Sequence, residues 1–387
     1  MATNSEAQRI EARDADREDW GLWGPYLSDR QWGTVREDYS ADGDAWAHFP
    51  FDQARSRAYR WGEDGLLGIS DRNGLLCFAP ALWNGKDPIL KERPFGLSNP
   101  QGNHGEDVKD YFYHLANGPT HAFMQGLYKY PQGEFPYQRL IEENGRRSRL
   151  EPEYELVDTG IFAENRYFDV FVEYAKFDPE DLAIRLRIVN RGPDPAPITV
   201  LPTLWFRNTW SWDLQPPRRP SLHLLPGGQC VIADCEGLPA YHLYADGTPE
   251  WLFTENETNE QRLYGTKNRS PYVKDAFHEH VVHGNAAATN PAGYGTRAAA
   301  CQRKVLAPSE EWTVRLRLCR TPMPNPFGGD FDALFATRAK EQAEHFEAAA
   351  PGISGELAHV MRSALAGLFW CKKFYLYPVG RWLRGDP

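Results

Sequence analysis

Residues Asp181–Asn190 read DLAIRLRIVN, and this stretch decides the fold class. The aliphatic residues at every second position from Leu182 to Ile188 alternate with polar ones, as in a half-buried antiparallel strand. The preceding stretch Arg166–Lys176 (RYFDVFVEYAK) is rich in aromatic and β-branched residues, and a Phe-Asp-Pro-Glu turn separates the two. We therefore expect two consecutive antiparallel strands here.

Short strand-like runs extend in both directions from this pair. Towards the N-terminus they begin at Arg57 and include a pair near Lys109–Ala116 and Thr120–Tyr130. Since Gly- and Pro-rich turns separate the runs, without helices between them, the pattern predicts a large antiparallel β-sandwich and not βαβ units. Towards the C-terminus the expected strands are Ile198–Phe206, Ser221–Leu225, Gln229–Asp234, Tyr241–Tyr244, Glu250–Phe253, Ala276–Val282, Arg297–Val305 and Trp312–Arg320.

The pattern changes to helical after the segment TPMPNPFGGD, which begins at Thr321. A first helix is expected within Asp330–Ala349, and a second helix follows Ser354, which is a good N-cap residue. The second helix is apolar on nearly all sides, so we expect it to be buried by partners outside this sequence. Exposure of Phe369, Trp370 and Phe374 would make the isolated chain aggregate.

These observations divide the chain into four parts. Residues 1–22 are expected to form a loosely held charged leader, 23–321 the β-sandwich, 322–353 a linker with a helix, and 354–387 the first helix of a further helical domain.

Composition excludes several classes of partner. The net charge is −10 and there is no basic run of five or more residues, so neither nucleic acid nor an anionic membrane is an expected partner. The first residues lack the apolar core of a signal peptide, and no apolar run is long enough to span a bilayer. The six cysteines contain no CxxC motif, so free thiols in the cytoplasm are expected.

The stretch Trp23–Gly65 combines four tryptophans with many Arg, Asp and Glu residues and has little periodicity before Arg57. Such a segment is unlike plain core, and we expect it to direct planar and charged side chains towards a ligand. The whole chain holds 13 tryptophans, and aromatic faces bind the apolar faces of sugars at little rotamer cost. The alternative is that most of them pack between the sheets.

The segment His278-Glu-His280, with His283 nearby, suggests a metal site. On a strand His278 and His280 would share one face and His283 would face away, which leaves the ligand set incomplete. We therefore expect a polar strand face and no metal.

Long blocks of the sequence resemble a known family. The blocks GPYLSDRQWGTVREDYS, RSRAYRWGEDGL, LWNGKDPILKERPFGL, GNHGEDVKDYFY, PTHAFMQGLYKYPQGEFPY, EPEYELVDTGIF, RYFDVFVEYAK and LPTLWFRNTW occur in order. Together they resemble the N-terminal part of bacterial proteins of glycoside hydrolase family 63, which are glucosidase-like enzymes. Residues 363–387 resemble the opening of the family's second domain.

The resemblance implies a β-super-sandwich followed by an (α/α)6 toroid, and hydrolysis of α-glycosidic bonds, chiefly of glucosides, with inversion and without a cofactor. In the family both catalytic carboxylates lie deeper in the toroid, and no position of this sequence matches them. We therefore assign no catalytic residue and expect no glycosidase activity from this chain alone. Within the sequence, Asp64 could pair with Glu106 or Asp107 as two catalytic carboxylates, but their turn-like surroundings favour solvated or capping roles.

The resemblance also implies that loops of the sandwich help to shape the sugar pocket at the mouth of the toroid. Planar Trp faces, bidentate Arg groups and carboxylates suit a polyhydroxylated ligand. The alternative is that the same residues only join the two domains through Arg–Asp pairs and buried Trp. The candidate substrate-binding residues are Trp32, Arg36, Asp38, Trp46, Arg60, Trp61, Asp64, Asn103, His104, Glu106, Asp107, Arg207 and Asn208.

Two other functions stay open at this point. The chain could be a carbohydrate-binding sandwich without activity, or a structural half that assembles with a separately encoded toroid. For the hydrolase and for the binding module the expected ligand is an oligosaccharide or a small glycoside, whereas the structural half binds no sugar and has the separate toroid chain as its partner.

Overall fold

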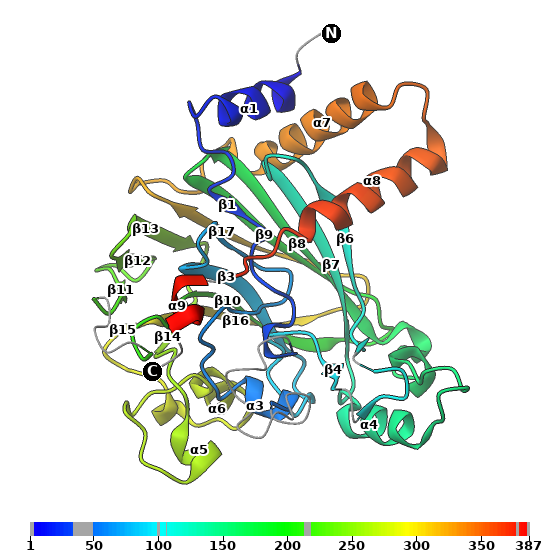
Figure 1. Cartoon of the computed structure of the whole chain (residues 1–387), viewed down its shortest axis with the longest axis vertical. Helices are drawn as coiled ribbons and strands as arrows, with labels where there is room; N and C mark the ends of the chain where they lie inside the picture. The colour runs from blue at the N-terminus through cyan, green and yellow to red at the C-terminus, as the bar shows by residue number, and fades with distance from the viewer. Residues whose placement is uncertain are drawn as a thin grey trace.

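The computed structural model describes residues 4–33, 49–98, 101–105, 107–212, 218–376 and 379–384. Two large antiparallel sheets stack face to face, with helices at the margins (Figure 1). The predicted mainly β fold with C-terminal helices is confirmed.

One of the two large sheets has six strands and the other has nine. In spatial order the first contains β1 (Trp23–Gly24), β2 (Ile69–Asp71), β3 (Leu76–Trp83), β10 (Ala196–Phe206), β16 (Arg297–Leu306) and β14 (Glu250–Thr254). The second contains β15 (Tyr294–Gly295), β11 (Ser221–Leu224), β12 (Cys230–Cys235), β13 (Leu238–Ala245), β17 (Glu311–Cys319), β9 (Asp181–Asn190), β8 (Tyr167–Asp178), β7 (Phe123–Pro131) and β6 (Phe112–Asn117). A separate ribbon pairs β4 (Gly96–Leu97) with β5 (Asp107–Val108).

The predicted strand pair forms the middle of the nine-stranded sheet. β8 pairs with β9 from Phe168↔Asn190 to Asp178↔Asp181, and β9 pairs on its other side with β17. Leu182, Ile184, Leu186 and Ile188 are fully buried in the core between the sheets, as the alternation predicts.

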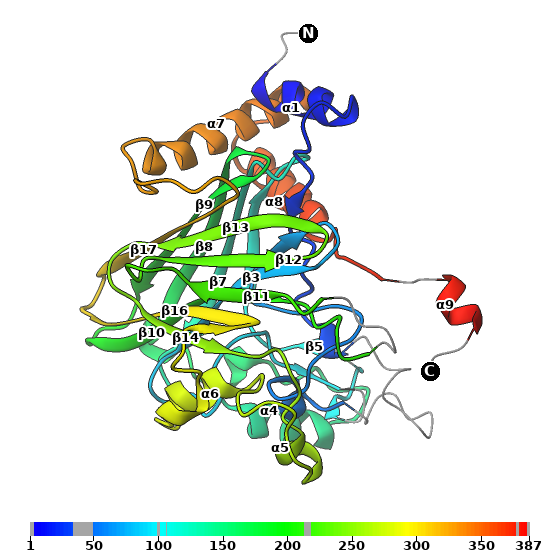
Figure 2. The ribbon, with the colours of Figure 1, turned by 90° about the vertical axis from the view of Figure 1, so that its left-hand side faces the viewer.

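Helices lie at both ends of the sandwich (Figures 1 and 2). α7 packs on β8 and α1, and α8 packs on β6. Several of these helices fall where the sequence predicts only strands and connections, because they are short and inserted between strands. The helices are α1 (Ser5–Asp14), α3 (Phe51–Ala54), α4 (Tyr137–Arg146), α5 (Glu260–Tyr264), α6 (Ala276–Val282), α7 (Phe331–Ala349), α8 (Gly355–Trp370) and α9 (Val379–Arg384), with single 3-10 turns at Gln31–Gly33, Leu156–Thr159, Ala163–Asn165 and Ala286–Ala288.

The prediction of a strand at Ala276–Val282 is wrong, because this segment is helix α6. Phe277 and Val281 are four residues apart and both buried, which is the spacing of one helix face. Phe277 and Val281 pack with Leu201 and other residues of β10 and β16 on the outer face of the six-stranded sheet. Helix α6 therefore covers this part of the outer face.

The charged leader is held firmly, which corrects the prediction of a loose segment. In α1 the buried carboxylate of Glu6 accepts hydrogen bonds from the backbone N–H of Thr120 at 3.1 Å and from its hydroxyl at 2.7 Å. Arg9 forms ion pairs with Glu6 at 2.9 Å and with Glu341 of α7 at 2.8 Å. Polar side chains, and not apolar ones, dock this helix, so hydrophobic periodicity does not reveal it.

Helix α8 is only partly unpartnered. Trp370 is fully buried, stacks on His114 with ring centroids 4.9 Å apart, and donates to the carbonyl of Ala116 at 3.1 Å. The expectation that Trp370 is exposed is therefore wrong, and Phe369 and Phe374 are half-buried. The opposite side of the helix remains apolar and exposed at Leu357, Val360 and Leu368.

The first tryptophan of the Trp-rich stretch belongs to the main core. Trp23 is fully buried, and its indole N–H donates to the hydroxyl of Tyr241 at 3.0 Å. The fully buried ammonium of Lys176 on β8 donates to the carbonyls of Trp20, Trp23 and Thr120, at 2.7, 2.6 and 3.1 Å. One lysine thus ties the N-terminal strand to the other sheet.

We expect Lys176→Met to lower the free energy of unfolding by about 3 kcal/mol, because three buried carbonyls lose their donor. Urea unfolding followed by circular dichroism measures the change. Lys129→Met is the control, since Lys129 is half-exposed and a change within about 1 kcal/mol is expected there.

The stability lost in Lys176→Met should also depend on pH. Burial lowers the pKa of Lys176 to about 7, below the value of the unfolded chain. Between these two values the unfolded state binds more protons, so the stability of the wild type should rise with pH relative to Lys176→Met. If the difference in unfolding free energy between the wild type and Lys176→Met is constant from pH 6 to pH 9, a lowered pKa of Lys176 is contradicted.

Candidate functional site

Three loops meet at one end of the six-stranded sheet, where β10 and β14 end and β16 begins. Arg207 follows β10 and donates from Nη1 to the carbonyl of Arg60 at 3.3 Å. Asn256 follows β14 and donates from Nδ2 to Glu63 Oε1 at 2.7 Å and to the carbonyl of Phe206 at 2.9 Å. The structure therefore joins the predicted residues of the first stretch to those after β10.

These loops carry three tryptophans, Trp61, Trp210 and Trp212, which we call the aromatic rim. All three side chains are half-buried, so part of each is accessible. The Arg60 guanidinium lies 4.5 Å from the Trp61 ring centroid, and the Arg219 guanidinium lies 5.4 Å from that of Trp210. Each guanidinium lies over one face of its ring, and Trp210 also packs against the core between the sheets, so a sugar could contact only the part of each ring that stays exposed.

Glu257 organises one side of the rim. Its carboxylate accepts from Trp210 Nε1 at 2.6 Å, from Ser211 Oγ at 3.1 Å and from Asn208 Nδ2 at 3.5 Å. Arg219 Nη2 lies 3.3 Å from Glu257 Oε1 and 2.9 Å from Glu255 Oε2. Asn208, a predicted site residue, is fully buried and holds the loop in place.

A buried ion-pair cluster lies beneath the rim. Arg93 Nε donates to Asp64 Oδ1 at 2.8 Å, and Arg297 Nη2 donates to Glu92 Oε1 at 2.6 Å. Together with Glu63, these residues line a cavity of about 10 Å³. No sugar fits such a space, so the cluster supports the rim and does not contact a ligand.

Burial changes the protonation of this cluster. It raises the pKa of Glu63 and lowers the pKa of Lys274 to about 7. Lys274 Nζ donates to the carbonyl of Arg57 at 2.8 Å and lies 3.5 Å from the ring centroid of Tyr59. Burial also acts on Glu92, but the adjacent Arg297 and Arg93 outweigh it and the pKa of Glu92 is lowered.

The remaining predictions from the first stretch have different outcomes. Trp32 is 2% exposed, packs edge-on against Phe51, and donates its backbone N–H to Asp64 Oδ2 at 3.1 Å. It therefore stabilises the loop from within and does not present a face to a ligand. Arg36, Asp38 and Trp46 lie outside the described residues.

The predicted site residues 103–107 contact a part of the chain other than the junction of the three loops. Asn103 is buried and donates to the carbonyls of Ser148 and Glu151, at 3.0 Å each, and exposed His104 also contacts the Glu151 carbonyl, at 2.8 Å. Asp107 forms a 2.6 Å ion pair with Lys109. Glu106 lies outside the described residues.

Neither Asp64 nor Asp107 has the environment of a general acid. Asp64 is buried and held by Arg93 and by the Trp32 N–H. Partial burial raises the pKa of Asp107, but hydrogen bonds from Lys109 outweigh it and the net pKa is lowered, which favours the ionised form.

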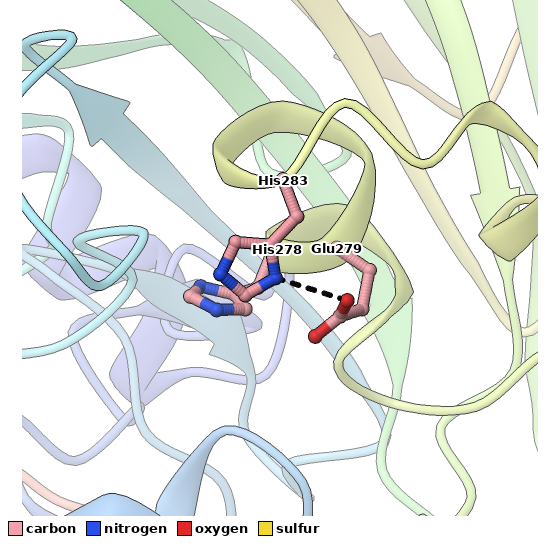
Figure 3. A group of neighbouring side chains, drawn as sticks. All are labelled: His278, Glu279 and His283. Carbon is pink, nitrogen blue, oxygen red and sulfur yellow. Dashed lines mark hydrogen bonds and ion pairs between the residues drawn. The ribbon is translucent and has the colours of Figure 1, made fainter.

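The histidine segment is helical, so the predicted polar strand face is not formed, and the ligand atoms of His278, Glu279 and His283 lie within 4.8 Å of one another (Figure 3). On α6 it is Glu279 and His283 that share a face, and their side chains lie 3.0 Å apart, whereas His280 pairs with Glu250. Burial lowers the pKa of His278 to about 4, so its ring is neutral, and its Nδ1 accepts the Leu90 N–H at 3.2 Å. A neutral imidazole has one ring lone pair, and this bond occupies it.

Sequence reasoning missed Glu63, Glu257, Trp210 and Lys274. Trp210 stands in the quoted block LPTLWFRNTW, next to the predicted Arg207 and Asn208, so proximity could have indicated it. Glu257 and Lys274 come from distant loops, and nothing in the local pattern marks them.

We expect Asp64→Asn to lower the free energy of unfolding by about 3 kcal/mol, because the buried guanidinium of Arg93 loses its strongest partner. Chemical denaturation monitored by tryptophan fluorescence tests this. Asp107→Asn is the matched control, with an expected change below about 1 kcal/mol, because its ion pair is partly exposed. Equal effects at the two positions would contradict a special role for Asp64.

No family model matches the chain. A relative in Saccharomyces cerevisiae (strain ATCC 204508 / S288c), the uncharacterized protein YMR196W, is 41% identical over 426 aligned residues, which cover 98% of this chain and 39% of the relative. The chain thus spans about two fifths of the length of the curated relative that it matches.

The matches among solved structures are weak. Polysaccharide lyase BACCELL_00875 is 12% identical with a TM-score of 0.29, covering 69% of this chain and 28% of that one. An Escherichia coli K12 protein assigned as an aldose 1-epimerase is 10% identical with a TM-score of 0.25, covering 54% and 67%. A human-microbiome protein assigned as a kojibiose phosphorylase is 8% identical with a TM-score of 0.28, covering 79% and 32%. At these scores the likeness does not define a function.

Proposed function

We propose that this chain is the β-sandwich part of a glycoside hydrolase of the family 63 type, which hydrolyses α-glycosidic bonds, chiefly of glucosides, with inversion. The enzyme acts in the cytoplasm on an oligosaccharide or small glycoside, without a redox or organic cofactor. The aromatic rim forms one wall of its sugar pocket.

The observation that carries this proposal is the chemistry of the aromatic rim. Three partly accessible tryptophans lie at one end of the six-stranded sheet, with Arg60 and Arg219 against two of them. A pyranose ring offers an apolar face and several hydroxyls, so it matches this combination of planar and hydrogen-bonding groups. The sequence blocks that resemble family 63 include Arg60, Trp61 and Trp210, and they support the same conclusion.

The proposed catalytic acid and base come from residues outside this sequence. An inverting glycosidase needs one protonated and one ionised carboxyl group about 6.5–9.5 Å apart with space for a water. Asp64 is locked to Arg93, and Glu257 is occupied by four donors around the rim. We therefore propose that residues 354–387 begin a toroid that supplies both carboxyl groups.

The exposed apolar side of α8 supports packing against further helices. Leu357, Val360 and Leu368 are 63%, 56% and 69% exposed, which is costly for a helix that remains uncovered. The toroid that covers them belongs either to a longer protein or to a separate chain. The greater length of the yeast relative is compatible with the first arrangement.

A second candidate function is a carbohydrate-binding or structural sandwich without activity. The favouring observation is that the carboxylates Asp64 and Glu257 near the rim are held by cations and donors. The two candidates differ in whether a toroid adds catalysis.

We expect the purified chain to release no glucose from maltose or p-nitrophenyl α-glucoside above the spontaneous rate, because the described carboxylates near the rim, Asp64 and Glu257, are held by Arg93 and by the donors around the rim. The full-length yeast relative should release glucose as the β-anomer first, which proton NMR detects. Turnover by the chain alone would overturn the assignment of catalysis to a toroid. Absence of turnover by the longer relative would favour the non-catalytic candidate.

We expect Trp61→Ala to weaken binding of maltose about tenfold, roughly 1.4 kcal/mol, through loss of ring stacking. Calorimetric titration of the chain with maltose and with mannosylglycerate measures this. Trp83→Ala, at the far end of β3, is the matched control because Trp83 is similarly half-buried. Unchanged affinity in Trp61→Ala would remove Trp61 from the wall.

A further inference from the structure

A second, polar hollow lies at the opposite end of the strands that carry the rim. Its volume is about 400 Å³, within the range of small-ligand sites. It is separate from the rim, because Arg297 and Arg303 on β16 are six residues apart, or roughly 20 Å along a strand. Its lining residues are Thr248, Glu250, Cys301, Gln302, Arg303, Lys304 and Trp312.

The hollow follows from the short length of β14. β14 pairs with β16 only from Arg297 to Cys301, so the remainder of β16 has no neighbouring strand on that side among the described residues. Gln302 and Lys304 lie in this uncovered part, and Trp312 reaches the same space from β17 of the other sheet. The site is therefore built where the two sheets separate.

The charges of the hollow neutralise one another. Arg303 pairs with Glu250 at 2.6 Å, and Lys304 pairs with Glu310 at 2.8 Å. Glu250 also contacts His280 at 3.0 Å. Because each of these cations is already paired with a carboxylate, the hollow has no surplus positive charge that could bind a phosphate or sulfate.

Trp312 provides the one planar surface of the hollow. Its ring is half-buried, with part of it packed against the core between the sheets and part lining the hollow. The hydroxyl of Thr248, the Arg303–Glu250 pair and the amide of Gln302, which also donates to the carbonyl of Asp246 at 3.3 Å, line the same hollow and offer donors and acceptors there.

We propose that this hollow is a second carbohydrate-binding site, which holds a neutral pyranose with its apolar face on Trp312 and its hydroxyls on Gln302, Thr248 and the Arg303–Glu250 pair. A neutral saccharide matches both the absence of surplus charge and the mixture of donors and acceptors around one aromatic ring. The site shares no residue with the aromatic rim and does not depend on the proposed hydrolytic function.

Titration of the whole chain with maltotriose, followed by calorimetry, tests the proposal. We expect Trp312→Ala to weaken one binding event about tenfold, while Trp312→Phe retains most of it and Trp61→Ala leaves it unchanged. Circular dichroism verifies that the Trp312 variants are folded, since part of this ring packs on the core.

A charge variant keeps the test independent of core packing. Glu250 is 45% exposed, and Glu250→Lys should abolish maltotriose binding at the hollow and create measurable binding of inorganic phosphate. The proposal is overturned by the same maltotriose affinity in the wild type and Trp312→Ala, by absence of binding to the wild type at millimolar concentrations, or by tighter binding of phosphate than of maltotriose to the wild type. If Trp61→Ala loses maltotriose binding and Trp312→Ala does not, the ligand is assigned to the rim alone.

Discussion

The arrangement of the site depends on two buried ion pairs, Asp64–Arg93 and Glu92–Arg297. Glu92 pairs with Arg297, the first residue of β16, and the adjacent Arg93 pairs with Asp64 in the loop that carries Trp61. A buried pair of this kind adds little net stability compared with apolar packing, but it is costly to break, so it specifies one arrangement of the loops. The aromatic rim is therefore placed by charges that no ligand touches.

The same strands present two different chemistries at their two ends. At one end of β10, β14 and β16, loops rich in Trp and Arg close over the sheet and the interior is filled to a cavity of about 10 Å³. At the other end, β14 begins too late to cover β16, and an open polar hollow of about 400 Å³ results. Sheet length, more than residue composition, decides which end is closed.

Local periodicity predicts the sheets well and the site poorly. The alternate spacing of the aliphatic residues from Leu182 to Ile188 predicts their burial, so β9 can be predicted directly from the sequence. Trp32 and Asp64 stand in an irregular, charged segment that suggests exposure, yet distant partners bury both. Trp370 is similar, because the ring of His114 that covers it is distant in the chain. The α6 segment satisfies strand and helix patterns alike over seven residues, and only its packing on β10 and β16 decides between them.

The clamp formed by Lys176 has a consequence for the order of folding. β1, β2 and β3 leave the ribosome early, but β3 pairs with β10 and the carbonyls of Trp20 and Trp23 need a lysine on β8. Contacts of such high sequence separation form late and slowly. The N-terminal strands must therefore wait, with unpaired edges, until the middle of the chain has been synthesised.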